Sequence, residues 1–261
     1  MAVAAIIRGL GGFISRASDS SGFGMRLLGR TALVLPALAR PRRFRDLLNL
    51  LYTYTLGALP VTLVVSVVVG MILAINSGVA LRDFGQEHRL GWLVALSMVR
   101  EMGPLMTGLI LAASIGSGVA AEIGTMKVSE EIDALTIMSI SPIRFLVLPR
   151  VTALMLLCPV MTILSGLVGT TGGAVVGRFQ FGVSFQMFRN EALANLEFLD
   201  IYQGLLKSLI FGATIALVGC TQGLRTSGGA TGVGDATRRA VVVSFLLILF
   251  FGYFITWFFY R

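Results

Sequence analysis

Three ionisable residues lie inside stretches of sequence that are otherwise apolar. Arg100 and Glu101 are adjacent within one long apolar run, and Lys207 interrupts another. A charged side chain at the bilayer centre costs about 2.5 to 3.5 kcal/mol on insertion scales, so such residues normally face a protein interior, a partner charge or water. In one interpretation the two cations bind a lipid phosphate while Glu101 limits the net charge. In the other, Glu101 and Lys207 form an internal ion pair that fixes helix packing.

Enzymatic constellations are scarce in the rest of the chain. No G-x-x-x-x-G-K-[ST] stretch is present, which excludes a P-loop for ATP. His88 is the only histidine and stands among charged neighbours, while Cys158 and Cys220 each lie alone in an apolar run. Their spacing suits neither zinc nor a disulfide framework, and the acidic residues form no metal-ligand cluster. We therefore expect no catalytic, cofactor or metal site in this chain.

The composition is that of a membrane protein. The sequence is 56% hydrophobic and 13% charged, where a soluble domain carries about 25% charged residues. About 20 apolar helical residues cross the roughly 30 Å hydrocarbon core, so the apolar runs predict an all-α integral membrane domain over residues 47–261. Its five expected transmembrane helices are 57–78, 91–121, 151–177, 201–224 and 240–260. Gly169, Gly173 and Gly177 recur every four residues, which predicts close contact with a neighbouring helix.

These spans place the three ionisable residues at similar depths. At 1.5 Å per residue, Arg100 and Glu101 lie about 14 Å, and Lys207 about 9 Å, from the same end of the bundle. We therefore expect all three to meet in one outward-facing cavity. Gly103 and Pro104 follow Glu101 at once. A kink is expected there, with a neighbouring helix satisfying the freed carbonyl group.

Basic residues are unevenly distributed along the chain. They gather in residues 1–46, 122–150 and 225–239, which five crossings place on one side of the membrane. The positive-inside rule makes that side cytoplasmic, with a cytoplasmic N-terminus and an external C-terminus. The net charge of +8 is thus a topology signal, and nucleic-acid binding is not expected. Within residues 1–46, apolar residues such as Ile6 and Leu10 recur at helical spacing, which predicts an amphipathic helix in the membrane interface; a disordered basic tail is the alternative.

The loop between the second and third spans contains a short amphipathic segment. Residues 129–139 read SEEIDALTIMS, in which Ser129 suits a helix cap and acidic residues occupy the first turn. Ile132, Leu135 and Met138 share one face. Such a helix suits insertion into a groove on a soluble partner; a helix lying on the membrane is the alternative. The candidate docking residues are Glu130, Glu131, Ile132, Asp133, Ala134, Leu135 and Met138.

Several motifs together resemble the MlaE/YrbE permeases, which are the membrane subunits of Mce-type ABC transporters. The stretch REMGPLMTGLILAASIGSGVAAEIGTMKVSEEIDAL, residues 100–135, is similar to the core of that family. The resemblance continues through SPIRFLVLPR at 141–150, LLKSLIFG around Lys207, and GGATGVGDATRRAVVVS at 228–244. These motifs follow one consistent order over most of residues 45–250.

The resemblance implies an MlaE-like permease fold, in a homodimer of five-span subunits within the bacterial inner membrane. Implied partners are two cytoplasmic ABC ATPase subunits, which bind ATP and magnesium, a periplasmic ring of MCE-domain proteins, and a small STAS-domain protein. The implied activity is transport of phospholipid or a related lipid between the inner membrane and the outer envelope. The resemblance also implies that Arg100, Glu101 and Lys207 line the lipid cavity, and that Glu130 to Leu135 contact the ATPase as a coupling helix.

Two other functions remain compatible with the residues themselves. An ion-coupled secondary transporter would carry protons on Glu101 or Glu122 and would work without an ATPase. A membrane-embedded scaffold would assemble without bound lipid. The amphipathic segment at 129–139 has no role in a proton carrier, so it favours the ATPase-driven permease.

Overall fold

Five helical stretches in the described part of the chain are long and apolar enough to cross a membrane. The computed structural model describes residues 41–260, with side chains from 47 onward, so the predicted N-terminal interfacial helix lies outside the described residues. The α-helices are α2 (Pro41–Asp83), α3 (Leu90–Ser97), α4 (Gly103–Leu111), α5 (Ser117–Val128), α6 (Glu131–Ile137), α7 (Leu148–Phe181), α8 (Phe185–Ala194), α9 (Phe198–Leu224) and α10 (Gly229–Phe259). Short segments join them: the 3₁₀ turn η2 (Glu87–Arg89) and the π-helical turns η3 (Met98–Met102), η4 (Ala112–Gly116) and η5 (Ile143–Val147). No strand occurs in residues 41–260, and the all-α membrane fold is confirmed.

The observed spans match the predicted ones in number and order, and each is longer. They run over Leu47–Asp83, Glu87–Val128, Ile143–Phe181, Phe198–Leu224 and Gly229–Phe259. The first span begins well before the predicted residue 57, because α2 is a single helix that continues through Pro60. Residues 47–56 contain no helix breaker, and Leu47 is buried. The last helix begins early because its polar first turns, which carry Asp235 and Arg238, also favour helix; these two residues form an i,i+3 ion pair.

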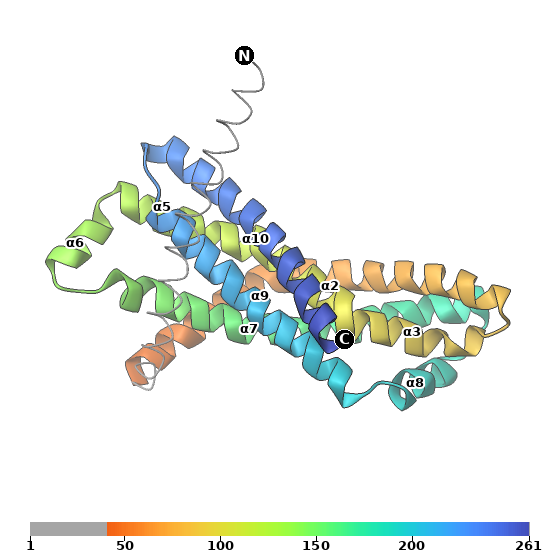
Figure 1. Ribbon diagram of the computed structural model, residues 1–261. Helices are drawn as coiled ribbons and strands as arrows, with labels where there is room; N and C mark the ends of the chain where they lie inside the picture. Colours follow the sequence, from red (N-terminus) through yellow and green to blue (C-terminus); the bar gives the residue numbers. More distant parts are fainter. Residues whose placement is uncertain (1–40, 261) are drawn as a thin grey trace, which may run out of the picture.

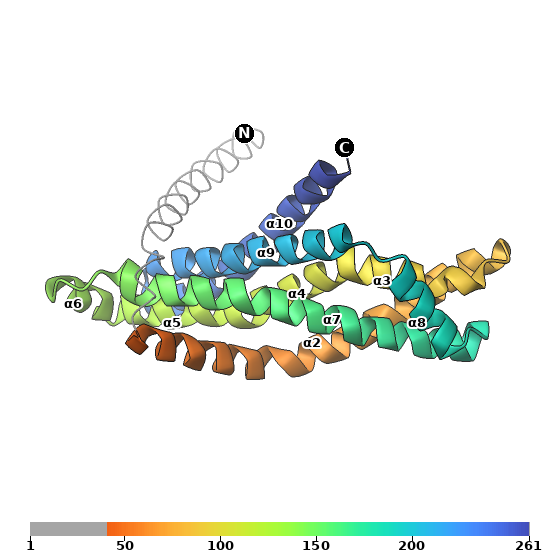
Figure 2. The same cartoon turned by 90° about the horizontal axis from the view of Figure 1, so that it is seen from below.

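The helices differ in how much of their surface the bundle covers. In the most apolar window of each span, 72% of α9 is buried but only 11% of α10. Figure 1 shows α6 at one end of the elongated bundle and α8 near the other, with the long helices running between them. Figure 2 shows α10 diverging from α9 toward its C-terminal end. Helix α9 is therefore the centre of the bundle, and α10 lies at its periphery.

Glycines bring α2 and α7 into backbone contact. A Cβ atom at Gly70 would lie only 1.8 Å from the carbonyl oxygen of Gly169, and one at Gly173 would lie 2.8 Å from the Val94 side chain. A Cβ at Gly177 would lie 3.2 Å from Phe188. The close helix contact predicted from the glycine ladder is confirmed, since a larger residue at Gly70 or Gly173 would clash with a neighbouring helix and one at Gly177 would be tightly packed against Phe188.

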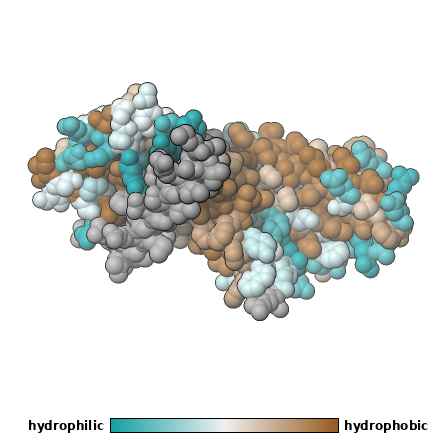
Figure 3. Space-filling model, turned by 45° about the horizontal axis from the view of Figure 1, so that its top comes forward, coloured by the Kyte–Doolittle hydropathy of each residue, from teal (hydrophilic) through white to brown (hydrophobic). Residues whose placement is uncertain are grey.

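The surface carries an apolar middle and polar ends. In Figure 3 brown, hydrophobic side chains gather over the middle of the molecule, and hydrophilic ones gather toward both ends. The exposed apolar residues include Val64 and Val68 on α2, and Leu246, Leu249 and Phe250 on α10. A water-soluble protein rarely exposes so continuous an apolar surface, whereas a lipid-facing surface requires it.

Candidate functional site: a buried polar cluster and the helix α6

Lys207 of α9 joins the two ionisable residues of η3. Its Nζ donates to Glu101 Oε1 at 2.5 Å and to the Arg100 carbonyl oxygen at 3.1 Å. Pro104 lacks the N–H group that would donate to that carbonyl in a regular helix. The lysine therefore takes the place of a backbone donor, and the prediction that a neighbouring helix satisfies the freed carbonyl is confirmed.

A second ion pair lies beside the first. Arg100 Nε donates to Asp200 Oδ1 at 2.6 Å, and the other carboxylate oxygen of Asp200 accepts from the Glu197 backbone N–H at 3.0 Å. Asp200 is 1% exposed, so its charge is buried but fully partnered. It belongs to a capping box with Glu197 that begins α9. The first turn of α9 thus fixes the position of the Arg100 guanidinium.

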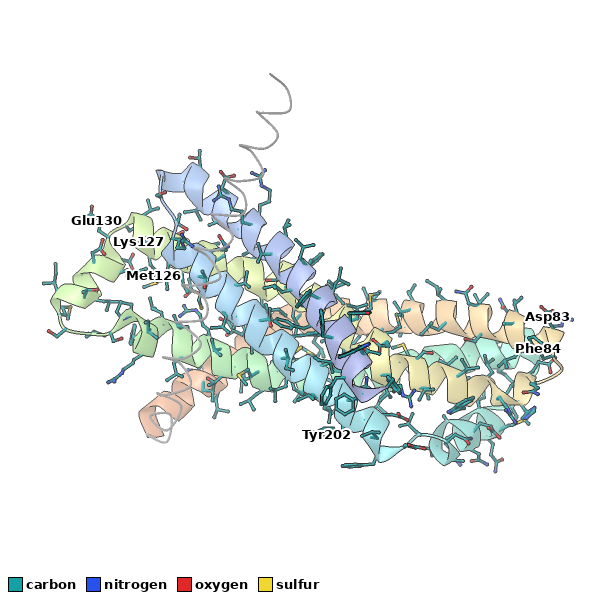
Figure 4. The ribbon with its side chains drawn as sticks, viewed as in Figure 1. Asp83, Phe84, Met126, Lys127, Glu130 and Tyr202 are labelled. Atoms are coloured by element: carbon teal, nitrogen blue, oxygen red, sulfur yellow. The ribbon has the colours of Figure 1, made fainter. Side chains whose placement is uncertain are left out.

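The C-terminal end of α10 completes this arrangement. Thr256 Oγ1 donates to Glu101 Oε1 at 2.9 Å, and the Tyr260 hydroxyl donates to Gln203 Oε1 at 2.9 Å. The Arg100 guanidinium lies 4.9 Å from the centre of the Tyr260 ring, within range of a cation–π contact. Tyr202, labelled in Figure 4, lies at the same end of α10, with its ring 6.3 Å from that of Phe259. We call the set Arg100, Glu101, Asp200, Gln203, Lys207, Thr256 and Tyr260 the polar cluster.

The charged side chains of the polar cluster differ in how much of their surface is exposed. The Lys207 side chain is 1% exposed, that of Arg100 27%, and that of Glu101 41%. The charges of the two cations and the two carboxylates cancel, and Glu101 is the most exposed of the four charged residues. Both η3 residues stand on a π-helical turn, a local departure from the α-helix that often occurs at functional sites. The three residues predicted to meet do meet, and the Glu101–Lys207 ion pair considered as one interpretation is present.

One buried donor of the polar cluster has no partner. Gln203 is 1% exposed, and its Nε2 has no hydrogen-bond partner among the described residues. Its carbonyl oxygen is used by Tyr260. Buried polar groups are satisfied in the large majority of cases, so an amide donor left over beside Arg100 and Lys207 is one that a ligand oxygen can accept from.

A cavity of about 670 Å³ lies behind the polar cluster, between α3, α7, α8 and α9. Its lining includes Val99 and Gly204, the immediate neighbours of Arg100 and Gln203, but none of the three ionisable residues predicted to line a cavity. The cavity and the polar cluster therefore share a level of the bundle and lie on opposite sides of η3 and α9. We call this cavity the lateral groove.

The amphipathic loop segment forms helix α6, with its faces distributed differently from the expectation. Ile132 is 6% exposed and belongs to the main apolar core, against which Leu135 also packs. Of the three residues on the predicted docking face, only Met138 projects outward, together with Ile137. Among the predicted docking residues, Glu130, Glu131, Asp133, Ala134 and Met138 are exposed. The expectation that Ile132 enters a partner's groove is wrong, because that side chain fills a gap in its own bundle.

Two non-glycine residues with left-handed backbones bound α6. Glu130 has φ 60° and Ser139 has φ 59°, a conformation that costs an L-residue roughly 1 to 2 kcal/mol. Ser129 ends α5 and does not cap α6, whose N-cap Glu130 makes no side-chain cap bond. In Figure 4 Lys127 and Glu130 lie at the junction of α5 and α6, and Lys127 pairs with Asp133 at 2.9 Å across it.

The helices on either side of α6 are tied together at their bases. Arg150 at the start of α7 donates to Glu122 Oε1 of α5 at 2.6 Å and to the Leu146 carbonyl at 2.8 Å. The Arg150 side chain is 8% exposed and that of Glu122 56%. The α5–α6–α7 loop is therefore closed by an ion pair whose cation is buried.

The comparison with family models decides the class of protein. Residues 47–258 match the model described as Permease MlaE. The chain belongs to the MlaE permease family.

Curated MlaE relatives cover most of this chain. A probable ABC transporter permease of Synechocystis sp. is 38% identical over 200 residues, covering 77% of this chain and 76% of its own. A probable ABC transporter permease of Rickettsia typhi is 38% identical over 199 residues, covering 76% and 77%. The Arabidopsis thaliana protein trigalactosyldiacylglycerol 1, chloroplastic, is 34% identical over 229 residues, covering 88% of this chain and 65% of its own.

This MlaE permease is thus an ABC transporter permease and a multi-pass membrane protein, a class that implies partnership with an ATPase subunit. The ion-coupled secondary transporter and the scaffold are not supported by its family. Sequence reasoning missed Asp200, Gln203, Thr256 and Tyr260. The spacing of Glu197 and Asp200 at the start of α9 was the one available signal, because a capping box needs an acid at the third helical position.

Proposed function

We propose that this MlaE permease moves phospholipid or a related lipid between the inner membrane and the outer envelope, driven by ATP hydrolysis in separate subunits. The name of the Arabidopsis relative contains a diacylglycerol-based glycolipid, which supports a lipid as the transported molecule. An apolar, membrane-spanning bundle with a charged cluster inside it suits a molecule that has acyl chains and a polar headgroup.

The polar cluster is the proposed headgroup site, with Arg100, Glu101 and Lys207 as its charged members. The unpartnered Gln203 Nε2 is the observation that carries this assignment. A lipid phosphate or ester oxygen would accept from that amide and from Arg100, whose fork suits phosphate oxygens. Because the cations are already paired, an anionic headgroup must displace a carboxylate. Glu101 has the more exposed carboxylate and is the one that would leave.

The proposed assembly is a homodimer with two cytoplasmic ATPase subunits, a periplasmic MCE-domain ring and a small STAS-domain protein. The nearly uncovered α10 supports a second copy, since its exposed aromatic residues provide an apolar contact surface. These aromatic residues are Phe250, Tyr253, Phe254, Trp257 and Phe258. The charge distribution supports a cytoplasmic N-terminus and a periplasmic C-terminus, which makes α6 cytoplasmic and available as the ATPase-coupling helix.

The headgroup assignment is tested with two matched variants of one hydrogen bond. Gln203→Leu removes both the bond from Tyr260 and the free amide donor, whereas Tyr260→Phe removes the bond alone. The chain is co-purified with its ATPase, its bound lipid is quantified by native mass spectrometry, and ATP-driven lipid transfer between vesicles is measured. We expect Gln203→Leu to lose bound lipid and transfer, with Tyr260→Phe close to wild type. Equal amounts of bound lipid and equal transfer by the two variants would refute the headgroup assignment.

The transport role is tested in the same preparation. Lys207→Met should abolish ATP-driven transfer while the dimer and its ATPase remain together. Arg238→Gln is the control, because Arg238 forms only an exposed pair near the start of α10. An assembly of two permeases and two ATPases that carries no lipid and transfers none would refute lipid transport.

A further inference from the structure

The lateral groove has one charged residue in an otherwise apolar lining. Along α7 it follows a stripe from Thr162 to Val175, and it is closed by Arg189 of α8 and Leu205 of α9. The hydroxyls of Thr170 and Thr171 donate to carbonyl groups of their own helix, so they present mainly their methyl groups. Arg189 is exposed, and no hydrogen bond or ion pair engages it within residues 41–260.

The length of the lateral groove suits an acyl chain. The α7 stripe is about 20 Å long at 1.5 Å per residue, comparable to the roughly 15 Å depth of one leaflet's hydrocarbon. One acyl chain of a lipid in that leaflet therefore matches the groove in length.

Arg189 lies at the end of the lateral groove where a lipid headgroup would lie. Helix α8 is a short amphipathic helix near the end of the bundle opposite α6 (Figure 1). It buries Phe188 and Ala192 and exposes Arg189 and Asn190, as a helix in the membrane interface does. From Arg189 the groove runs inward to Val99 and Gly204, at the level of the polar cluster.

We propose that the lateral groove binds one anionic phospholipid, with an acyl chain along α7 and the phosphate on Arg189. The acyl chain gains little from burial, because it leaves an equally apolar bilayer, so packing along α7 holds the chain and the exposed arginine supplies the charge selectivity. The site is separate from the polar cluster and lies behind it. This inference extends the proposed function by giving the permease a second place for lipid within one subunit.

The lateral groove can be filled by a substitution on α7. A Cβ at Gly166 would meet only Val99 Cγ2, at 3.9 Å, an ordinary contact distance, so Gly166→Leu projects into the groove. Gly57 of α2 is exposed and also has open space around it. Gly57→Leu is therefore a matched control: the same change, in a helix, outside the groove.

The test uses the full chain in lipid nanodiscs, without ATPase or ATP. Two photoreactive probes with identical acyl chains are compared, phosphatidylglycerol and diacylglycerol, and the labelled peptides are mapped by tandem mass spectrometry. We expect phosphatidylglycerol to label residues 162–175 and 201–205. Gly166→Leu should abolish that labelling, and Gly57→Leu should leave it intact. Arg189→Gln should reduce phosphatidylglycerol labelling roughly two- to fivefold without changing diacylglycerol labelling, and added inorganic phosphate should not compete.

Several outcomes would overturn this proposal. They are an unlabelled groove, equal labelling by both probes with no effect of Arg189→Gln, loss of labelling to inorganic phosphate, and recovery of a partner's transmembrane helix cross-linked to the groove. Thermal unfolding of each variant checks that it is folded. Because no transport is measured, a labelled groove in a chain that fails ATP-driven transfer would refute only the transport role. An unlabelled groove in a transporting chain would refute only the groove.

Discussion

Lys207 Nζ lies 2.5 Å from Glu101 Oε1 and 3.1 Å from the Arg100 carbonyl oxygen, so one lysine on α9 holds two consecutive residues of η3. The partners of this ion pair are not equivalent. The Lys207 side chain is 1% exposed, whereas that of Glu101 is 41% exposed. Removing Glu101 leaves the buried Lys207 cation without its partner carboxylate. Removing Lys207 leaves a Glu101 carboxylate that can turn outward.

Loss of the acid should therefore cost more stability than loss of the base. We expect Glu101→Leu to destabilise the chain by about 3 kcal/mol, at the lower end of the cost of stranding a buried charge. Lys207→Met should cost about 1 to 2 kcal/mol, because Glu101 can turn outward but the Arg100 carbonyl loses its donor, and the double variant should resemble Lys207→Met. Thermal unfolding in detergent measures all three. Equal losses for the two single variants would show that the burial difference has no energetic consequence.

The contact between α2 and α7 should tolerate no side chain at Gly70. Its Cβ would lie 1.8 Å from the Gly169 carbonyl oxygen, and the two helices must separate to admit it. We expect Gly70→Ala to lower stability by roughly 1 to 3 kcal/mol. Gly57→Ala, on the same helix with open space around it, should be neutral or stabilising by up to about 1 kcal/mol. Comparable melting temperatures for the two variants would contradict this packing.

The turn after α6 should reveal its backbone strain through substitution. Ser139 has φ 59° and is exposed, so a change there alters backbone preference with little change in packing. Ser139→Val should destabilise the chain by roughly 1 to 2 kcal/mol, because a β-branched residue is a rare outlier in this region. Ser139→Gly should not destabilise it. The measurement is again thermal unfolding, and a stable Ser139→Val variant would argue against the left-handed turn.

The ion pair between Arg150 and Glu122, at the base of the α6 loop, should contribute measurably to the free energy of unfolding. Arg150 is 8% exposed, and its Nε has no hydrogen-bond partner within the described chain. We expect Glu122→Gln to cost about 2 kcal/mol, less than for a fully buried pair since Glu122 is half exposed. Asp235→Asn removes two exposed pairs on α10, with Arg238 and Arg239, and should cost less than about 0.5 kcal/mol. Matching melting temperatures for these two variants would refute the distinction.

Residues of α6 should separate into a folding set and a docking set. Ile132→Ala should lower stability by roughly 2 to 5 kcal/mol, because Ile132 lies in the core. Met138→Ser should leave stability unchanged, since Met138 is 68% exposed, but should weaken co-purification of the ATPase. Unfolding and pull-down of the same two variants measure both effects. Retention of the ATPase by Met138→Ser would exclude this residue from the dock.

The charged residues of the polar cluster could be predicted to meet because hydropathy fixes depth. Counting residues from the end of each span placed Arg100, Glu101 and Lys207 at similar levels, and the loss of the Pro104 N–H predicted that another helix would satisfy the Arg100 carbonyl. Depth, however, does not determine the direction in which a side chain points. The pairing of Arg100 with Asp200 depended on the α9 capping box, which lies outside the apolar run.

Other features required the three-dimensional arrangement. The inward direction of Ile132 could not be read from its spacing, because the amphipathic pattern of α6 fits a partner's groove and its own bundle equally well. Glu122 and Arg150 are 28 residues apart, so no helical period relates them. The lateral groove could not be predicted for a similar reason, since its lining comes from four helices that no spacing in the sequence relates.

The Lys207–Glu101 pair also constrains the order in which this membrane protein can be made. The two residues are 106 positions apart, and the acid comes first. At about 5 to 20 residues per second, translation delivers the lysine roughly 5 to 20 s after Glu101 has left the ribosome. During that interval the early helices must be sheltered by the insertion machinery or by water. Only when α9 arrives can Lys207 pair with Glu101, so this part of the bundle is completed by its fourth span.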